Sequence, residues 1–229
     1  IDEFAESIVD GPGAPMRLSI FTGPRGVGKT AMLNAIGDRA QADFQWLVLH
    51  DTATPGFLTR LTRAIDAFLG LKPARSVTGV SLPTILGSGG GGLTMSPRPA
   101  EPAAVDFRQI LAPLLDHCEA NGTGVLITLD EVHADNSDEL RQLATAAQHL
   151  VREERQFALA FAGLPAAVDD LLDANQITFL RRADRHDLRD VPLEDVATAL
   201  HDTIGKSGRE ITPDALEVAT QATGGYPFM

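Results

Sequence analysis

The chain alternates short apolar runs with amphipathic stretches along most of its length. Consecutive apolar residues between turn residues are typical of buried strands, whereas apolar residues three or four positions apart indicate helices. The apolar runs predict strands at residues 16–22, 44–50, 124–131 and 157–162. The helical spacing predicts helices at residues 1–9, 31–41, 57–69, 107–121 and 138–154. Strands that alternate with helices in this way predict an α/β fold with a parallel sheet.

Two further features of the pattern refine this fold. Residues 44–50 contain the unbroken run Trp46-Leu47-Val48-Leu49, which predicts a strand buried on both faces. After Arg189 the pattern becomes entirely helical, with one helix over 193–204 and another from an N-cap at Thr212 to Gly224. We therefore expect an α/β domain at residues 1–189 and a partial helical lid at residues 190–229.

The stretch at residues 72–102 departs from both patterns. It holds five prolines and the run Gly87-Ser88-Gly89-Gly90-Gly91-Gly92. A structureless loop of that length is unusual inside a compact domain. Residues 77–82 and 93–95 can pair as a projecting hairpin, and a mobile surface insertion explains the composition equally well. In either case we expect an insertion within the α/β domain.

The first apolar strand leads into a motif with a specific chemistry. Gly23-Pro24-Arg25-Gly26-Val27-Gly28-Lys29-Thr30 fits G-x-x-x-x-G-K-[ST], the phosphate-binding loop called Walker A, and Ala31 continues into the predicted helix. Glycines allow successive backbone N–H groups to point at a phosphate, and the helix N-terminus adds its positive end. The Lys29 ammonium suits the β- and γ-phosphates, and the Thr30 hydroxyl suits Mg²⁺.

Two carboxylates at the end of a later strand complement this loop. The buried run Leu126-Ile127-Thr128-Leu129 ends in Asp130 and Glu131. In open α/β sheets, ligands bind beside the carboxyl ends of the strands. We expect Asp130 to support Mg²⁺ and Glu131 to deprotonate the attacking water.

Composition limits the remaining possibilities. The 229-residue chain has a net charge of −12, which argues against nucleic-acid binding by this fragment alone. The single cysteine, Cys118, lies in an apolar helical pattern, which favours a buried thiol and a reducing compartment. The sequence contains no apolar run that could span a bilayer and shows no zinc-ligand spacing. We predict a cytoplasmic protein, and the start at Ile1 indicates a fragment of a longer one.

Residues 126–131 resemble the Walker B segment of the AAA+/STAND group of P-loop ATPases, near the origin-recognition-type initiators. Residues 179–182 and the run Gly224-Gly225-Tyr226-Pro227 are similar to later motifs of these proteins, so the resemblance covers nearly the whole chain. It implies a three-layer αβα P-loop NTPase fold with a C-terminal helical lid. It also implies that Pro227 lies near the nucleotide, as in the G-x-P motif.

The resemblance further implies a role for an arginine. Arg181 or Arg182 matches the region in which such proteins place an arginine that faces the γ-phosphate on a neighbouring subunit, and we assign Arg182 as the candidate. An arginine pair in salt bridges with Asp184, Asp187 or Asp190 is an equally supported alternative.

The sequence also departs from the family pattern. The strand at 157–162 leads into Gly163-Leu164, where the family offers a polar side chain to the γ-phosphate, and Gly224-Gly225 offers no lid arginine. Both departures favour slow hydrolysis. Asp130-Glu131-Val132-His133 resembles the DExH box of helicases, but no second RecA-like unit accompanies it, so we interpret His133 as a solvated histidine.

The leading hypothesis is therefore a Mg²⁺-dependent ATP-binding module that hydrolyses ATP to ADP and phosphate slowly, as a conformational switch. The expected partners are ATP or ADP and another protein or a second copy of the chain, without a membrane. Two alternatives are a nucleotide-locked interaction module without turnover and a DNA-associated initiator or transposition-helper ATPase.

Overall fold

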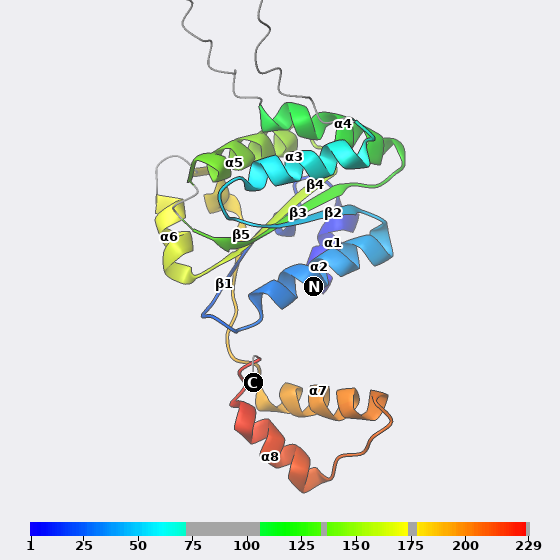
Figure 1. The fold of residues 1–229 in the computed structure, drawn as a ribbon, viewed down its shortest axis with the longest axis vertical. Coiled ribbons are helices and arrows are strands. Elements are labelled where there is room, and N and C mark those ends of the chain that lie inside the picture. Colours follow the sequence, from blue (N-terminus) through cyan, green and yellow to red (C-terminus); the bar gives the residue numbers. More distant parts are fainter. Residues whose placement is uncertain (72–105, 134–136, 174–177, 228–229) are drawn as a thin grey trace, which may run out of the picture.

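The computed structural model describes residues 1–71, 106–133, 137–173 and 178–227. The predicted insertion at 72–102, including the alternative of a hairpin, lies outside these residues. The described α/β part is a parallel five-stranded sheet in the order β2-β3-β4-β1-β5, flanked by helices (Figure 1). This arrangement confirms the predicted α/β P-loop fold.

The helices divide between the two faces of the sheet. Helices α3, α4 and α5 lie on one face, and α1 and α2 lie on the other (Figure 1). The strands are β1 (Leu18–Thr22), β2 (Leu47–Thr52), β3 (Val125–Val132), β4 (Phe157–Gly163) and β5 (Asp184–Asp187). The helices of this part are α1 (Asp2–Asp10), α2 (Lys29–Phe44), α3 (Phe57–Phe68), α4 (Phe107–Ala120), α5 (Ser137–Arg152) and α6 (Pro165–Asp173), with 3₁₀ turns at Pro15–Arg17 and Thr178–Arg182.

The core forms one apolar layer on each face of the sheet. Alternate residues of β3 point to opposite faces, so Ile127 packs with α3, α4 and α5, whereas Leu126 packs with α1 and α2. Both side chains are fully buried. The strand carboxyl ends are thereby held at one edge of the sheet, where loops can form a site.

The prediction for residues 44–50 is wrong in two respects. Helix α2 continues through Phe44, and the Trp46 N–H caps it by donating to the Ala40 carbonyl over 3.1 Å, so the strand begins only at Leu47. This strand, β2, also lies at an edge of the sheet, and Leu49 is its only buried residue. Because an edge strand has a neighbouring strand on one side only, the side chains of β2 are less buried than the apolar run predicted.

Strand β5 was not predicted from the apolar pattern. Its sequence, Asp-Arg-His-Asp, contains no apolar residue, and it pairs with β1 at the other edge of the sheet. Edge strands are often polar, because their outer side faces solvent. Its backbone pairing, rather than apolar burial of its side chains, makes it a strand.

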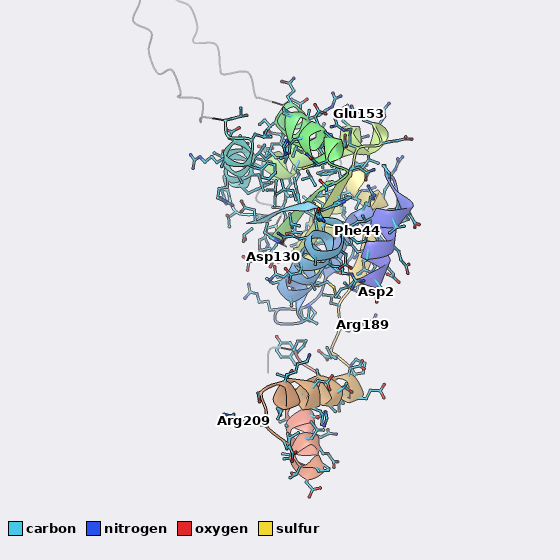
Figure 2. All side chains as sticks on the ribbon, turned by 90° about the vertical axis from the view of Figure 1, so that its right-hand side faces the viewer. Asp2, Phe44, Asp130, Glu153, Arg189 and Arg209 are labelled. Atoms are coloured by element: carbon cyan, nitrogen blue, oxygen red, sulfur yellow. The ribbon has the colours of Figure 1, made fainter. Side chains whose placement is uncertain are left out.

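The helices after Arg189 match their prediction. Helix α7 (Leu193–Lys206) and helix α8 (Pro213–Thr223) contact each other below the carboxyl end of β1 and are here called the helical unit (Figure 1). The Thr212 side chain caps α8 by accepting from the Ala215 N–H over 3.3 Å, as expected. The chain enters this unit near Arg189 (Figure 2). The domain boundary between residues 189 and 190 stays a prediction.

One buried arginine fastens α1 to the sheet. Arg17 is 3% exposed and donates to the carbonyl oxygens of Ser7 at 2.9 Å and Ile8 at 2.8 Å and to the Gln156 side chain at 3.0 Å. Its guanidinium also lies 5.0 Å from the centre of the Trp46 ring. These carbonyls belong to the last turn of α1, where helices generally leave carbonyl groups without intrahelical donors. Burial lowers the pKa of Arg17 to about 10.

We expect Arg17→Met to lower the free energy of unfolding by about 2–4 kcal/mol, because it leaves buried carbonyl groups without donors. Urea unfolding followed by the fluorescence of Trp46 measures this change. Arg63→Met, at an exposed position of α3, is the matched control and should cost less than about 0.5 kcal/mol. Equal stabilities of the two variants would show that Arg17 does not anchor α1.

Candidate functional site

The predicted phosphate loop lies between β1 and α2, as the motif requires. Strand β1 ends at Thr22 and α2 begins at Lys29. Gly23 has no room for a side chain, because a Cβ there would lie 2.7 Å from the Leu188 carbonyl oxygen and 2.8 Å from Val27 Cγ1. The loop therefore curls tightly over the carboxyl end of β1.

Lys29 folds back over its own loop. Its Nζ donates to the carbonyl oxygens of Gly23 at 2.9 Å and Pro24 at 2.7 Å. Burial lowers the pKa of Lys29, while the nearby Asp130 carboxylate acts in the opposite direction. The ammonium is thus held beside the loop by neutral acceptors that a phosphate group can replace.

The sheet order brings the two predicted carboxylates to this loop. Strand β4 separates β1 from β3, so the two functional strands lie roughly 10 Å apart. The first turn of α2 crosses this gap, and the Thr30 hydroxyl donates to the Asp130 carboxylate. Residues 100 positions apart in sequence are thereby joined.

Glu131 has an unusual backbone. Its φ is +55°, in the left-handed region, and the pairing of β3 with β4 shifts register between Leu129 and Val132. The Glu131 N–H donates to the Asp130 side chain over 2.8 Å. The irregularity interrupts the alternation of the strand and presents both acids at the same edge.

These groups line one pocket of about 590 Å³ at the carboxyl ends of β1, β3 and β4. Its lining residues are Arg25, Gly26, Gly28, Lys29, Thr30, Ala31, Asp130, Glu131, His133, Gly163, Leu164 and Pro227. The structure therefore brings together Lys29, Thr30, Asp130 and Glu131, which the sequence placed in one site. Where β4 ends, Gly163 and Leu164 give the pocket a wall without polar side-chain atoms.

The donor set at the pocket fits Mg²⁺ held together with a nucleotide. The Thr30 hydroxyl and the Asp130 carboxylate are hard oxygen donors in mutual contact. Mg²⁺ commonly takes one or two protein oxygens and completes its shell with phosphates and water. Within the described residues, no group of three or more His, Cys, Asp or Glu side chains forms a metal cage of its own. A cation here would therefore depend on the phosphate groups.

His133, which we interpreted as a solvated histidine, lines the pocket. It is half-buried and follows Val132, which pairs with Gly163 at the end of β4. The ring nitrogens of histidine can donate or accept hydrogen bonds. Its position three residues after Asp130 was the available sequence signal.

Arg182 does not lie with the other predicted site residues. It is exposed and lines a separate cavity with Arg17, Leu18 and Phe157, which mark the amino ends of β1 and β4. Of the three aspartates in the alternative for the arginine pair, Asp187 pairs with Arg185, which also pairs with Asp169. A role of Arg182 toward a neighbouring molecule stays a prediction.

The chain that leads to the helical unit is tied to the start of the loop. The Leu188 N–H donates to the Thr22 carbonyl over 2.7 Å, and the Thr22 hydroxyl donates to Asp187. This hydrogen bond lowers the pKa of Asp187, and Arg185 acts in the same direction. Pro227, beyond α8, lines the pocket 4.0 Å from the place of a Cβ on Gly28.

The left-handed backbone at Glu131 yields a stability prediction. We expect Glu131→Gly to leave the free energy of unfolding equal or to raise it by up to about 1 kcal/mol, because glycine adopts a positive φ without strain. Glu131→Val should lower it by about 1–2 kcal/mol. Thermal unfolding of the variants measures both effects.

Glu154 provides the matched control, since it is exposed, has a φ of +54° and lies outside the pocket. The same pair of substitutions there should give the same stability differences. A Glu131→Val variant as stable as Glu131→Gly would refute backbone strain at this position.

The sequence of this chain is similar to that of a known protein family. Residues 6–159 match the family model described as AAA ATPase domain. No curated protein sequence matches the chain. Among the described residues, no helix has the length and apolar character needed to cross a membrane.

Solved structures with the same fold include replication initiators. A DNA replication initiation factor is 12% identical with a TM-score of 0.57, and the match covers 96% of this chain and 54% of that one. DnaA from Aquifex aeolicus bound to AMPPCP is 11% identical with a TM-score of 0.55, covering 96% and 55%. ORC1 from Aeropyrum pernix in complex with DNA is 14% identical with a TM-score of 0.53, covering 97% and 54%. The chain thus spans about half the length of these structures.

Proposed function

The chain belongs to the AAA ATPase domain family, and we propose that it binds ATP with Mg²⁺ and hydrolyses it slowly, as a conformational switch. The observation that carries this proposal is the contact between Thr30 and Asp130 in a pocket that also holds Lys29 and Glu131. The Lys29 ammonium, the oxygens of Thr30 and Asp130 and the Glu131 carboxylate thereby surround a space large enough for a triphosphate.

In this proposal the loop holds the phosphates. The backbone N–H groups at residues 26–31 and the N-terminus of α2 bind the β-phosphate, and Lys29 leaves the Gly23 and Pro24 carbonyls to bind the β- and γ-phosphates. Thr30 and Asp130 hold Mg²⁺, which when bound neutralises charge on the phosphate oxygens. The nucleotide-bound neighbour, DnaA with AMPPCP, supports a nucleotide as the ligand.

Glu131 is the group we propose for hydrolysis. Its exposed carboxylate accepts a proton from water as the water oxygen bonds to the γ-phosphorus. The bond between that phosphorus and the β–γ bridging oxygen breaks, and ADP leaves with this oxygen. His133 borders the same space and can hydrogen-bond to the water or to the γ-phosphate.

The slow rate follows from two positions at which the described residues bring no polar side chain to the pocket. Gly163 and Leu164 bring no polar side chain to the pocket, and neither do Gly224 and Gly225. Charge that develops on the γ-phosphate therefore meets no side-chain donor from these positions, and electrostatic stabilisation is a large part of most catalytic rate enhancements.

Removing the Lys29 ammonium should abolish ATP binding, because it is the principal positive charge that we assign to the phosphates. We expect the Kd of Lys29→Ala for ATP with Mg²⁺ to rise by at least about 100-fold. Isothermal titration calorimetry measures this change. Lys206→Ala, at the exposed end of α7, is the control and should bind as the unaltered protein does. Equal affinities of the unaltered protein and the Lys29 variant would contradict the proposal.

Neutralising Glu131 should separate binding from hydrolysis. We expect Glu131→Gln to keep its affinity for ATP within about threefold and to lose hydrolysis by about 100-fold, since the amide cannot accept the proton. Phosphate release under single-turnover conditions measures the rate, and Glu154→Gln is the control. An unchanged rate in Glu131→Gln would exclude Glu131 as the base.

The apolar wall at Gly163 and Leu164 favours a second candidate function, in which the module holds nucleotide without turnover and acts only through a partner. The two candidates differ in one observable quantity. Phosphate release that requires Mg²⁺ and disappears in Glu131→Gln supports the switch, whereas its absence in the unaltered protein supports the locked module.

The partners that we propose are a second copy of the chain or another protein. Arg182 is exposed and lies away from the phosphate-loop pocket of its own chain. This position suits a residue that contacts the nucleotide of a neighbouring copy. A DNA-associated role is suggested by the fold shared with ORC1 in complex with DNA, but the net charge of −12 counts against direct DNA binding by this chain alone.

A further inference from the structure

The single tyrosine of the chain contacts the phosphate loop from outside the pocket. The Tyr226 hydroxyl donates to the Arg25 carbonyl oxygen. The same hydroxyl lies so close to Gly26 that it would overlap a Cβ at that position. Arg25 and Gly26 line the pocket, and Tyr226 is absent from the residues that line it. Tyr226 thus contacts two loop residues that line the pocket, without lining the pocket itself.

The orientation of the peptide between Arg25 and Gly26 follows from this contact. No cis peptide bond occurs among the described residues, so this peptide is trans. In a planar trans peptide, the C=O and the N–H point in opposite directions. A hydroxyl that holds the Arg25 carbonyl therefore directs the Gly26 N–H away from Tyr226. Gly26 has a φ of +76°, where glycine tolerates more than one orientation of the neighbouring peptides.

The tyrosine itself is held by the turn after α8. Gly224 ends the helix with a left-handed φ of +56°, and the Tyr226 N–H donates to the Thr223 carbonyl over 2.9 Å. The Gly225 carbonyl accepts from the Val191 N–H over 2.7 Å, in the segment between β5 and α7. Gly225 is also confined, because a Cβ there would overlap the Val191 carbonyl oxygen. The turn is therefore fastened at both ends before it reaches the loop.

We propose that Tyr226 is a positioning residue for phosphate binding, which fixes the 25–26 peptide so that the Gly26 N–H faces the phosphates. This inference rests on the proposed nucleotide-binding function. It assigns to the helical unit a task in preparing the loop, in addition to any contact that Pro227 makes with a nucleotide. The groups it concerns are the β- and γ-phosphates, because they are the part of the ligand that the loop receives.

The test removes only the hydroxyl. Tyr226→Phe keeps the ring and its packing, so the fold should survive. We expect its Kd for ADP and ATP with Mg²⁺ to rise by about three- to tenfold, which corresponds to the loss of one neutral hydrogen bond. Its Kd for adenosine should not change, because adenosine has no phosphate for the Gly26 N–H to meet. Calorimetry or competition with a fluorescent nucleotide measures these affinities.

Ser207→Ala is the matched control. The Ser207 hydroxyl donates to the Ile204 carbonyl over 2.7 Å, so this variant also loses a hydroxyl-to-carbonyl bond in the helical unit, but away from the loop. It should bind every nucleotide as the unaltered protein does. Unaltered affinity for ATP and ADP in Tyr226→Phe would overturn the inference, as would tighter binding. An equal loss for adenosine and ATP would also overturn it, since the effect would then act outside the phosphate loop.

The same measurements separate this inference from the proposed function. An unaltered protein that binds neither ATP nor ADP contradicts the proposed function itself. If the unaltered protein binds ATP and Lys29→Ala does not, the proposed function stands, and the Tyr226→Phe affinities alone decide the inference.

Discussion

The hydrogen bond between Thr30 and Asp130 depends on the order of the strands. Because β4 lies between β1 and β3, the phosphate loop and the carboxylates stand on either side of a gap rather than against each other. A gap of roughly two strand spacings leaves room for phosphate groups above the end of β4. If β1 and β3 were neighbours, their side chains would fill this space. The pocket is thus a consequence of topology as much as of the residues that line it.

Much of this arrangement could be predicted from the sequence, and the failures share a cause. The buried strands β1, β3 and β4 have apolar runs that can be satisfied only inside a sheet, and the G-x-x-x-x-G-K-T spacing requires a strand before it and a helix after it. The two edge strands were misjudged. Polar β5 gains its structure by pairing with β1, and β2 is only partly covered. Apolar periodicity indicates which residues are buried. An edge strand can form by backbone pairing with few buried side chains, so this pattern does not predict it reliably.

The site was predictable to the extent that its residues belong to a motif. Lys29, Thr30, Asp130 and Glu131 converge because both segments end at the same edge of a parallel sheet. The sequence carried no sign of the left-handed backbone at Glu131. This backbone lies within the register shift between β3 and β4, and a register shift is a property of two strands together.

The hydrogen bonds of the loop explain why the orientation of its peptides before binding affects the affinity for phosphate. The Lys29 ammonium donates hydrogen bonds to the Gly23 and Pro24 carbonyls. A phosphate that binds Lys29 must therefore displace these two acceptors. The net gain from this exchange is smaller than the attraction of an unpaired ammonium would be, because the lost bonds offset part of it. Backbone N–H groups of the loop face no such competition if they already point at the ligand. Their orientation then decides much of the affinity, and every group outside the pocket that holds a loop carbonyl contributes to it.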